Sequence, residues 1–110
     1  MHVVQPDISR CGGLTEIRRI AELSELYGAK VIPHGWKTGI LAACGRHFQA
    51  SCPASPLFEF ISPLVYESPL RRDLVTPEPA VRDGLMDLPE GVGLGIELDP
   101  ETVERYRVAA

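Results

Sequence analysis

The sequence predicts an α/β fold in which short parallel strands alternate with helices. Two observations support this fold class. Residues 1–61 alternate short apolar runs with two amphipathic segments, which is the order expected for right-handed crossovers between parallel strands. Residues 62–110 hold six of the ten prolines and show no sustained helical period before Asp99. We therefore expect a strand-and-helix region over residues 1–61 and, over residues 62–110, a tail of irregular chain with short strands and a terminal helix.

The first apolar run, residues 2–5, predicts a strand, because a proline and an aspartate follow it and end the pattern. This strand delivers Asp7 at its carboxyl end. Residues 14–27 carry apolar side chains at steps of three and four, which predicts an amphipathic helix. Gly28 follows as the usual signal for the end of a helix.

The same order repeats along the next part of the chain. Residues 29–33 form a second short strand pattern that ends in His34, and residues 40–51 show the helical spacing of apolar side chains. Residues 57–61 are a third apolar run, which carries Glu59 among its apolar neighbours. Three strands separated by two helices are therefore expected in this region.

The sequence of the tail predicts only short helices and strands. Residues 83–84 are an Asp-Gly pair between short apolar runs, which favours a bent strand or a hairpin. Asp99 stands directly before a proline, and this pair is typical of an N-cap and a first helical position. A short terminal helix is therefore expected over residues 100–106.

The composition narrows the partners and the location of the protein. The net charge is −4 and Lys and Arg form no cluster, which argues against nucleic acid. The longest apolar runs are far shorter than the roughly 20 residues that a membrane span needs, and no basic-then-apolar leader opens the sequence. We therefore expect a cytoplasmic protein with no membrane partner. The three cysteines form no CxxC pair and are expected to be reduced, partly buried thiols.

The predicted strand ends carry the candidate chemistry, because parallel α/β proteins gather their functional side chains there. Asp7, His34 and Glu59 end or lie near the three strands, and neighbouring strands are about 4.8 Å apart. Asp beside His makes a general acid/base pair, in which the carboxylate orients the imidazole and stabilises its protonated form. Such a pair requires Asp7 and His34 to approach within about 2.6–3.2 Å. The structural alternative is a turn cap for Asp7 and a hydrogen-bonded strand-end histidine for His34.

Trp36 and Lys37 follow His34 after one glycine, in the loop at the same edge. They are candidates for an aromatic wall and for a cation that binds a substrate carboxylate. A packing tryptophan and a surface lysine are the alternative. His47 lies inside the second helical segment without a partner His or Cys at the spacing of metal ligands, so we predict a structural role for it and no metal site in the chain.

Five segments, taken in order, carry a resemblance to one known family: VQPDISRCGGLTE (4–16), VIPHG (31–35), FE (58–59), DG (83–84) and PEGVGLG (89–95). Together they resemble the C-terminal portion of the mandelate racemase and muconate lactonizing enzyme family of the enolase superfamily, and are most similar to its acid-sugar dehydratases. The resemblance implies that the three strands are the sixth, seventh and eighth of a (β/α)8-type barrel. The tail would then return to a capping domain.

The resemblance also implies roles for the strand-end residues. His34 matches the general acid/base of a His-Asp dyad, Asp7 matches its orienting partner, and Glu59 matches an acid that contacts the substrate carboxylate or its enediolate form. The implied reaction is proton abstraction next to a carboxylate, carried out by a dehydratase or a racemase on a substrate such as a sugar acid.

The resemblance places the remaining chemistry outside this chain. Mg²⁺ assists enolase-superfamily reactions, but the family holds it on carboxylates of the third to fifth strands and carries a lysine base on the second. The chain alone is therefore expected to be inactive. We expect it to need the remainder of the barrel or a homo-oligomer as its partner.

Two alternatives stay open from the sequence. The chain could be a non-catalytic remnant or interaction module that lacks the metal site and folds with a partner. It could also be a free-standing small α/β binding domain in which Asp7 and His34 are structural.

Overall fold

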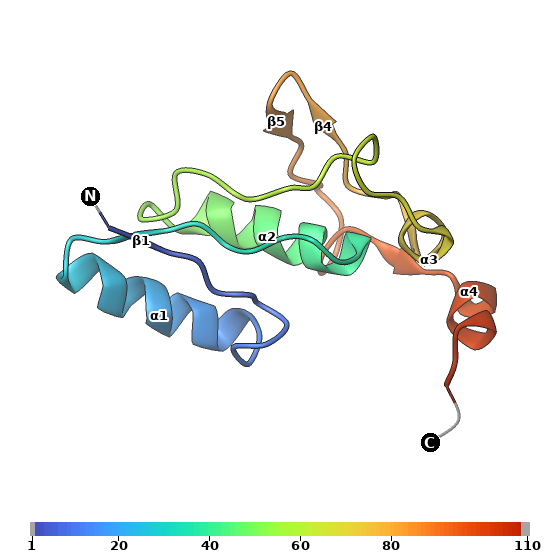
Figure 1. Ribbon diagram of the computed structural model, residues 1–110, viewed down its shortest axis with the longest axis horizontal. Helices are drawn as coiled ribbons and strands as arrows, with labels where there is room; N and C mark the ends of the chain where they lie inside the picture. Colours follow the sequence, from blue (N-terminus) through green and yellow to red (C-terminus); the bar gives the residue numbers. More distant parts are fainter. Residues whose placement is uncertain (1, 109–110) are drawn as a thin grey trace.

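The structure is a computed structural model that describes residues 2–108. Its first half consists of β1 (Val3–Val4), α1 (Leu14–Leu26), β2 (Lys30–Val31) and α2 (Gly39–Ser51), with β1 and β2 paired in parallel. Figure 1 shows α1 and α2 beside the extended chain that runs through both strands. The predicted order of strand, helix, strand and helix is confirmed, and each helix ends within one residue of its predicted limits.

Backbone pairing continues past the two short strands toward their carboxyl ends. The amide of Ile32 donates to the carbonyl of Val4 at 3.0 Å, and the amide of His34 donates to the carbonyl of Pro6 at 3.0 Å. A parallel bridge then joins Asp7 and His34. Proline lacks a backbone donor, so regular strand structure is interrupted here although the chains stay side by side. This pairing fixes Asp7 opposite His34.

The third predicted strand, residues 57–61, is an extended segment and not a regular strand. Two backbone hydrogen bonds join the segment 54–61 to the β2 chain: Val31 N–H to Ala54 at 3.0 Å, and Glu59 N–H to Pro33 at 3.2 Å. These contacts are five residues apart on the third segment but only two apart on the β2 chain. The third segment therefore bulges between them and cannot form a continuous ladder.

The core lies between the two long helices and the extended segments. Six buried side chains form it: Ile8, Ile17, Ala21, Val31, Leu41 and Phe48. The spacing of four residues between Ile17 and Ala21 puts both on the face of α1 that packs near β2. Gly45 lets α2 approach the third segment, because a Cβ at this position would overlap the ring of Phe58. The three cysteines are free thiols that pack, partly buried, against this core, as predicted.

One sheet edge and one helix end of this region carry exposed apolar side chains. Val3 and Val4 are 48% and 38% exposed, and among residues 2–108 no strand pairs with the other edge of β1. Leu26 and Tyr27 are also exposed, although the apolar pattern of α1 extends to them. Parallel strands are ordinarily covered on both faces. Further strands and helices ordinarily pack against surfaces such as the free edge of β1 and the exposed end of α1.

The tail holds short strands, and it holds one short helix that the sequence does not predict. It contains α3 (Pro69–Asp73) and an antiparallel pair formed by β3 (Val75–Thr76) and β6 (Glu97–Leu98). A helix of five residues and strands of two residues are too short to produce a recognisable period. The strands β3 and β6 are short strands of the kind expected in the tail, and α3 is an element that the sequence does not predict.

The two elements that the sequence predicts in the tail are both present. β4 (Val81–Arg82) and β5 (Leu85–Met86) form the expected hairpin, and its turn residues 83–84 have φ angles of 51° and 77°, as a two-residue type I′ turn requires. In α4 (Pro100–Arg105), the carboxylate of Asp99 caps the helix by accepting an amide hydrogen bond at 2.6 Å. Within the described part of the chain, no helix is long and apolar enough to cross a bilayer.

A buried arginine in α3 holds the start of the tail together. Arg71 is 4% exposed, and its guanidinium donates to the carbonyls of Ile61 and Tyr66 at 2.9 and 2.8 Å. It also pairs with the carboxylate of Glu78 at 3.2 Å. One side chain thus connects the end of the third segment with two stretches of the tail.

A second buried arginine fastens the later part of the tail to α2. Arg46 is 8% exposed and donates to the carbonyls of Asp87 and Leu94 at 3.3 and 2.9 Å. His47 Nε2 lies 3.1 Å from the same Leu94 carbonyl oxygen. The contact gives His47 the structural role that the sequence predicts for it.

Candidate functional site

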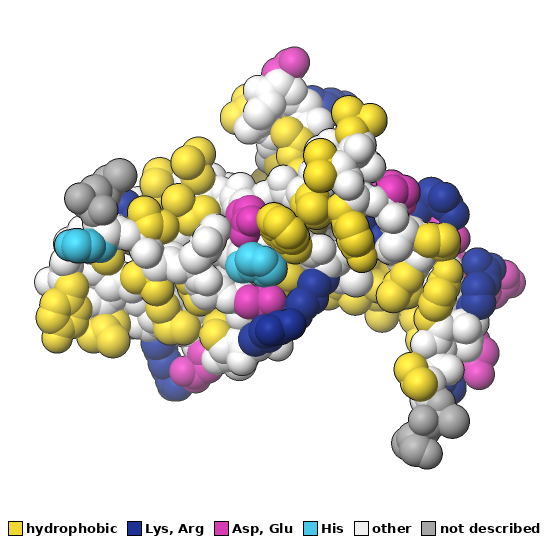
Figure 2. Space-filling view, viewed as in Figure 1, with side chains coloured by type: hydrophobic (Ala, Val, Ile, Leu, Met, Phe, Trp, Pro, Cys, Tyr) yellow, Lys and Arg dark blue, Asp and Glu magenta, His cyan; other side chains and the backbone are white. Residues whose placement is uncertain are grey.

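The carboxylate of Asp7 and the imidazole of His34 face each other at neighbouring strand ends. Asp7 Oδ2 lies 3.5 Å from His34 Nδ1, which is longer than the predicted hydrogen bond of about 2.6–3.2 Å. His34 Nδ1 is buried and has no hydrogen-bond partner among the described residues. The predicted hydrogen bond is therefore corrected to a looser contact. On the face in Figure 2, a histidine patch lies between acidic patches and beside basic side chains, in agreement with these contacts.

Asp7 is held in place by its own turn and by a lysine. Its Oδ1 accepts hydrogen bonds from Ser9 N at 2.8 Å and Ser9 Oγ at 2.6 Å, and its Oδ2 lies 3.2 Å from Lys37 Nζ. Burial raises the pKa of Asp7, but the hydrogen bonds from Ser9 and Lys37 outweigh it and bring the pKa to about 2. Asp7 is consequently a carboxylate at neutral pH, fixed in direction and 11% exposed at its side chain.

Lys37 lies inside this cluster. Its ammonium donates to Ser9 Oγ at 2.8 Å and pairs with Asp7 Oδ2. The sequence places Lys37 in the same loop but does not reveal this pairing. The Lys37 contact at 3.2 Å is shorter than the His34 contact at 3.5 Å, so Lys37 binds the oxygen that the predicted His34 hydrogen bond would use.

Glu59 joins the same edge through Trp36 and Gln5. The indole N–H of Trp36 donates to Glu59 Oε1, and Gln5 Nε2 donates to Glu59 Oε2 at 3.2 Å. The Trp36 ring also stacks on the His34 ring, with centroids 5.8 Å apart and planes inclined by 22°. Trp36 therefore bridges His34 and Glu59. The structure brings together all five residues that the sequence singles out.

Sequence reasoning missed Gln5 and Ser9, and each has a signal that could have revealed it. Gln5 stands two residues before Asp7, and alternate residues of extended chain point to the same face. Ser9 stands two residues after Asp7, which is the position whose amide an aspartate accepts in an Asx turn. The contacts of Ser9 with Asp7 have this geometry.

Gly35 allows the His34 strand end and the Glu59 segment to approach. A Cβ at position 35 would overlap the carbonyl oxygen of Glu59 and crowd the ring of Phe58. The close approach belongs to the same stretch in which Glu59 N–H donates to Pro33. The glycine therefore sets the separation between two of the candidate site residues.

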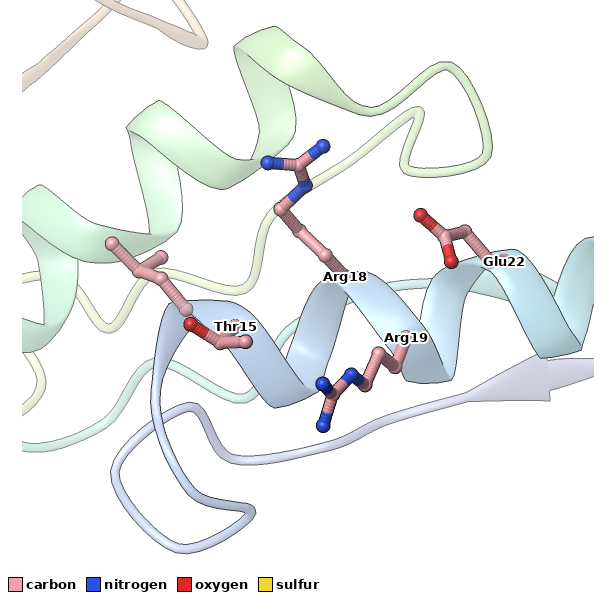
Figure 3. Close-up of a pocket in the computed structure, with 5 residues that line it drawn as sticks. Thr15, Arg18, Arg19 and Glu22 are labelled. Carbon is pink, nitrogen blue, oxygen red and sulfur yellow. The ribbon is translucent and has the colours of Figure 1, made fainter.

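The largest hollow of the surface, of about 500 Å³, adjoins this cluster, because Ser9 and Lys37 are among the residues that line it. A hollow of about 320 Å³ lies on α1, lined by Leu14, Thr15, Arg18, Arg19 and Glu22. Figure 3 shows Arg18 and Glu22 projecting from one side of α1 and Arg19 from the other. Because these charged groups do not converge, the hollow on α1 lacks the arrangement of a binding or catalytic site.

The cluster does not fit a metal ion. Among residues 2–108, no group of three or more His, Cys, Asp and Glu side chains could hold one. Asp7 Oδ2 is instead approached by Lys37, by His34 and by Arg10 at 3.6 Å. A carboxylate with these neighbours pairs with an imidazole and an ammonium and does not bind a divalent cation.

The fold and the site together define an α/β domain with an acid and an imidazole at paired strand ends and a second acid on the adjoining extended segment. Residues 1–102 match the family described as enolase C-terminal domain-like, and the chain belongs to this family. The resemblance to the mandelate racemase and muconate lactonizing enzyme family is thereby confirmed. The α/β class is confirmed with it.

Individual relatives and solved structures agree with this assignment. The chain is 32% identical over 114 residues to D-galactarolactone cycloisomerase from Agrobacterium fabrum, covering 96% of this chain and 29% of that protein. It is 36% identical over 102 residues to L-rhamnonate dehydratase from Saccharopolyspora erythraea, covering 90% and 25%. The crystal structure of a mandelate racemase/muconate lactonizing enzyme from Jannaschia sp. CCS1 superposes with a TM-score of 0.83 at 32% identity, covering 99% and 27%. The chain thus spans between a quarter and a third of these proteins.

Proposed function

We propose that this chain is the C-terminal part of an enolase-superfamily enzyme that acts on a sugar acid, as a dehydratase or a racemase. In this proposal, the chain segments ending at Asp7, His34 and Glu59 are the sixth, seventh and eighth strands of a (β/α)8-type barrel. The uncovered edge of β1 would pair with the strand that precedes it in the barrel. The tail, residues 62–110, would return toward a capping domain.

The observation that carries the proposal is the placement of an ionised acid opposite a histidine at parallel strand ends. Asp7 faces His34 Nδ1, which leaves the other ring nitrogen, Nε2, to exchange a proton with the substrate. The curated relatives named above are a cycloisomerase and a dehydratase of sugar-acid compounds. A positioned acid/base next to a carboxylate substrate suits both kinds of reaction.

In the proposed reaction, His34 Nε2 takes the proton from the carbon next to the substrate carboxylate. In a racemase, an acid on the opposite face of that carbon, supplied from outside this chain, would deliver a proton there, while His34 later gives up the proton that it took. In a dehydratase, a proton and the departing hydroxyl group leave together as water. Asp7 stabilises the protonated imidazole while it holds the proton. Glu59 would hydrogen-bond the substrate, and Trp36 and Lys37 would flank it at the rim.

The metal of the proposed enzyme is assigned to residues outside this chain. The described residues do not form a metal-binding group, and no step above depends on one. The cytoplasm remains the expected location, and the rest of the barrel or a second copy of the chain remains the expected partner.

The protein expressed from the complete reading frame that contains residues 1–110 tests this proposal. It is assayed against a panel of sugar acids, first unchanged and then as His34→Asn. The variant should lose about 10²–10⁴-fold in kcat, the usual contribution of a positioned acid/base. His2→Asn is the matched control, because His2 is exposed and remote from the cluster. Undiminished turnover by His34→Asn would contradict the assignment of His34.

A non-catalytic remnant or interaction module is the second candidate, and it is favoured by the Asp7–His34 distance of 3.5 Å, which is longer than the hydrogen bond of a working acid/base pair. If it is correct, the protein from the complete reading frame turns over no sugar acid of the panel. The same cluster would then serve only to hold the strand ends together. The panel assay on the unchanged protein therefore separates the two candidates before any variant is made.

A further inference from the structure

Lys37 and His34 compete for one oxygen atom of Asp7. Lys37 Nζ lies 3.2 Å from Asp7 Oδ2, and His34 Nδ1 lies 3.5 Å from the same atom. Only the lysine contact is short enough for a good hydrogen bond. The result is the buried His34 Nδ1 without a hydrogen-bond partner among the described residues.

The arrangement of the loop makes this competition a fixed property of the site. Lys37 follows His34 by three residues, so both side chains leave the same short loop and reach the same carboxylate. Ser9 closes the arrangement, because its hydroxyl accepts from Lys37 at 2.8 Å and donates to Asp7 Oδ1 at 2.6 Å. Lys37 is therefore connected to both oxygens of Asp7, directly and through Ser9.

We propose that Lys37 is a positioning residue that acts through Asp7 to weaken the hold of His34 on a proton. The ammonium offsets the negative charge that would stabilise a protonated imidazole, and it keeps Oδ2 from closing on Nδ1. After His34 has taken the substrate proton, it then passes that proton on, for example to a departing hydroxyl group, more readily than a histidine paired with a free carboxylate. The inference rests on the proposed function for its catalytic meaning, but the charge effect itself does not require turnover.

The other charged groups near His34 have weaker or opposite effects. Arg10 Nε lies 3.6 Å from Asp7 Oδ2, but its side chain is 77% exposed and screened by solvent, compared with 39% for Lys37. Glu59 is negative and is joined to the His34 ring only through Trp36. Lys37 is thus the cation with the most direct effect on the Asp7–His34 contact.

The test follows the His34 ring by NMR during a pH titration of the protein from the complete reading frame. The ring signals of His34 are identified by their loss in His34→Asn. In Lys37→Met, the ring should become protonated at a higher pH than in the unchanged protein, because the charge of Asp7 is no longer offset by the ammonium. Lys37→Arg should restore most of the original behaviour. Lys30→Met removes the other lysine, which has no contact with Asp7, and should leave the titration unchanged.

A second background shows whether Lys37 acts through Asp7. In Asp7→Asn, the ammonium loses its charged partner, so adding Lys37→Met should shift the His34 titration by less than half as much as it does in the unchanged protein. An equal shift in both backgrounds, or no shift in Lys37→Met alone, overturns the inference.

Kinetics on the same variants separate this role from a substrate contact. If Lys37 acts through Asp7, Lys37→Met moves the acid limb of the kcat profile to higher pH. A rise in KM with an unmoved pH profile overturns the inference and assigns Lys37 to the substrate alone. If the unchanged protein shows no turnover, the proposed function fails, while the NMR titration still decides the role of Lys37.

Discussion

The strand-and-helix region and the tail are held together by different forces. Residues 1–61 bury a continuous apolar core between α1, α2 and the extended segments, yet they leave the Val3 and Val4 edge uncovered. The tail is held by two buried arginines, Arg71 of α3 and Arg46 of α2, and both mostly bind backbone carbonyls. The first region is therefore specified by apolar pattern, and the tail by a few polar side chains that satisfy its irregular backbone.

The strongest test of this difference removes the arginine at the centre of the tail. Arg71→Met should destabilise the protein by about 3 kcal/mol, because it leaves two carbonyls without their donor and the Glu78 carboxylate without its buried partner. Urea unfolding measures the loss, and limited proteolysis should show cleavage confined to residues 62–110. Arg72→Met is the matched control, because the side chain of Arg72 is 59% exposed. Equal losses for the two variants would show that the tail does not depend on Arg71.

The second test acts on the first region, where backbone segments approach closely. Gly35→Ala should cost about 2 kcal/mol, because the added methyl group overlaps the carbonyl oxygen of Glu59 and forces the segments apart. Turnover should fall by more than the loss of folded protein explains, since His34 and Glu59 would separate. Gly91→Ala is the control, because a Cβ there meets its nearest neighbour at 3.7 Å. Stability and turnover are measured on the same preparations of both variants. Equal values for Gly35→Ala and Gly91→Ala in both measurements would contradict this account.

The sequence was sufficient to predict the first region because its elements follow simple periods. The spacing of apolar side chains located both helices, and the order of elements predicted the parallel pairing of β1 and β2. The prediction of a regular third strand was wrong because hydrogen-bond register depends on where the chain bulges. No local sequence pattern indicates the position of such a bulge. The tail was predicted only where turn and cap chemistry is local, at residues 83–84 and at Asp99.

The candidate site followed from topology, but its internal contacts did not. Parallel strand ends bring Asp7, His34 and Glu59 to one edge, and the sequence shows this once the strands are placed. Which donor takes which oxygen depends on side-chain reach across the loop, and here Lys37 reaches Asp7 Oδ2 more closely than His34 does. The roles of the site residues remain predictions until the variants above are measured.

The smallest expected effect concerns the acid stability that Asp7 gives to the first region. Its pKa is lowered to about 2 from an ordinary value of 3.8, so the contacts of the carboxylate stabilise the folded state fully above about pH 4. This contribution is lost as the pH falls toward 2, because the folded state must then bind a proton that the unfolded state has already bound. Solvent screens the partly exposed Lys37, so the contribution is about 1 kcal/mol.

Asp7→Asn should therefore lower the unfolding free energy at neutral pH and reduce its fall between about pH 4 and about pH 2.5. Urea unfolding across this range measures the slope. Asp83→Asn is the matched control, because Asp83 is exposed in a turn whose positive φ asparagine also accepts. If Asp7→Asn kept the full acid dependence, the acid sensitivity would not come from the Asp7 cluster, and the cluster would contribute no more to the fold than the exposed turn does.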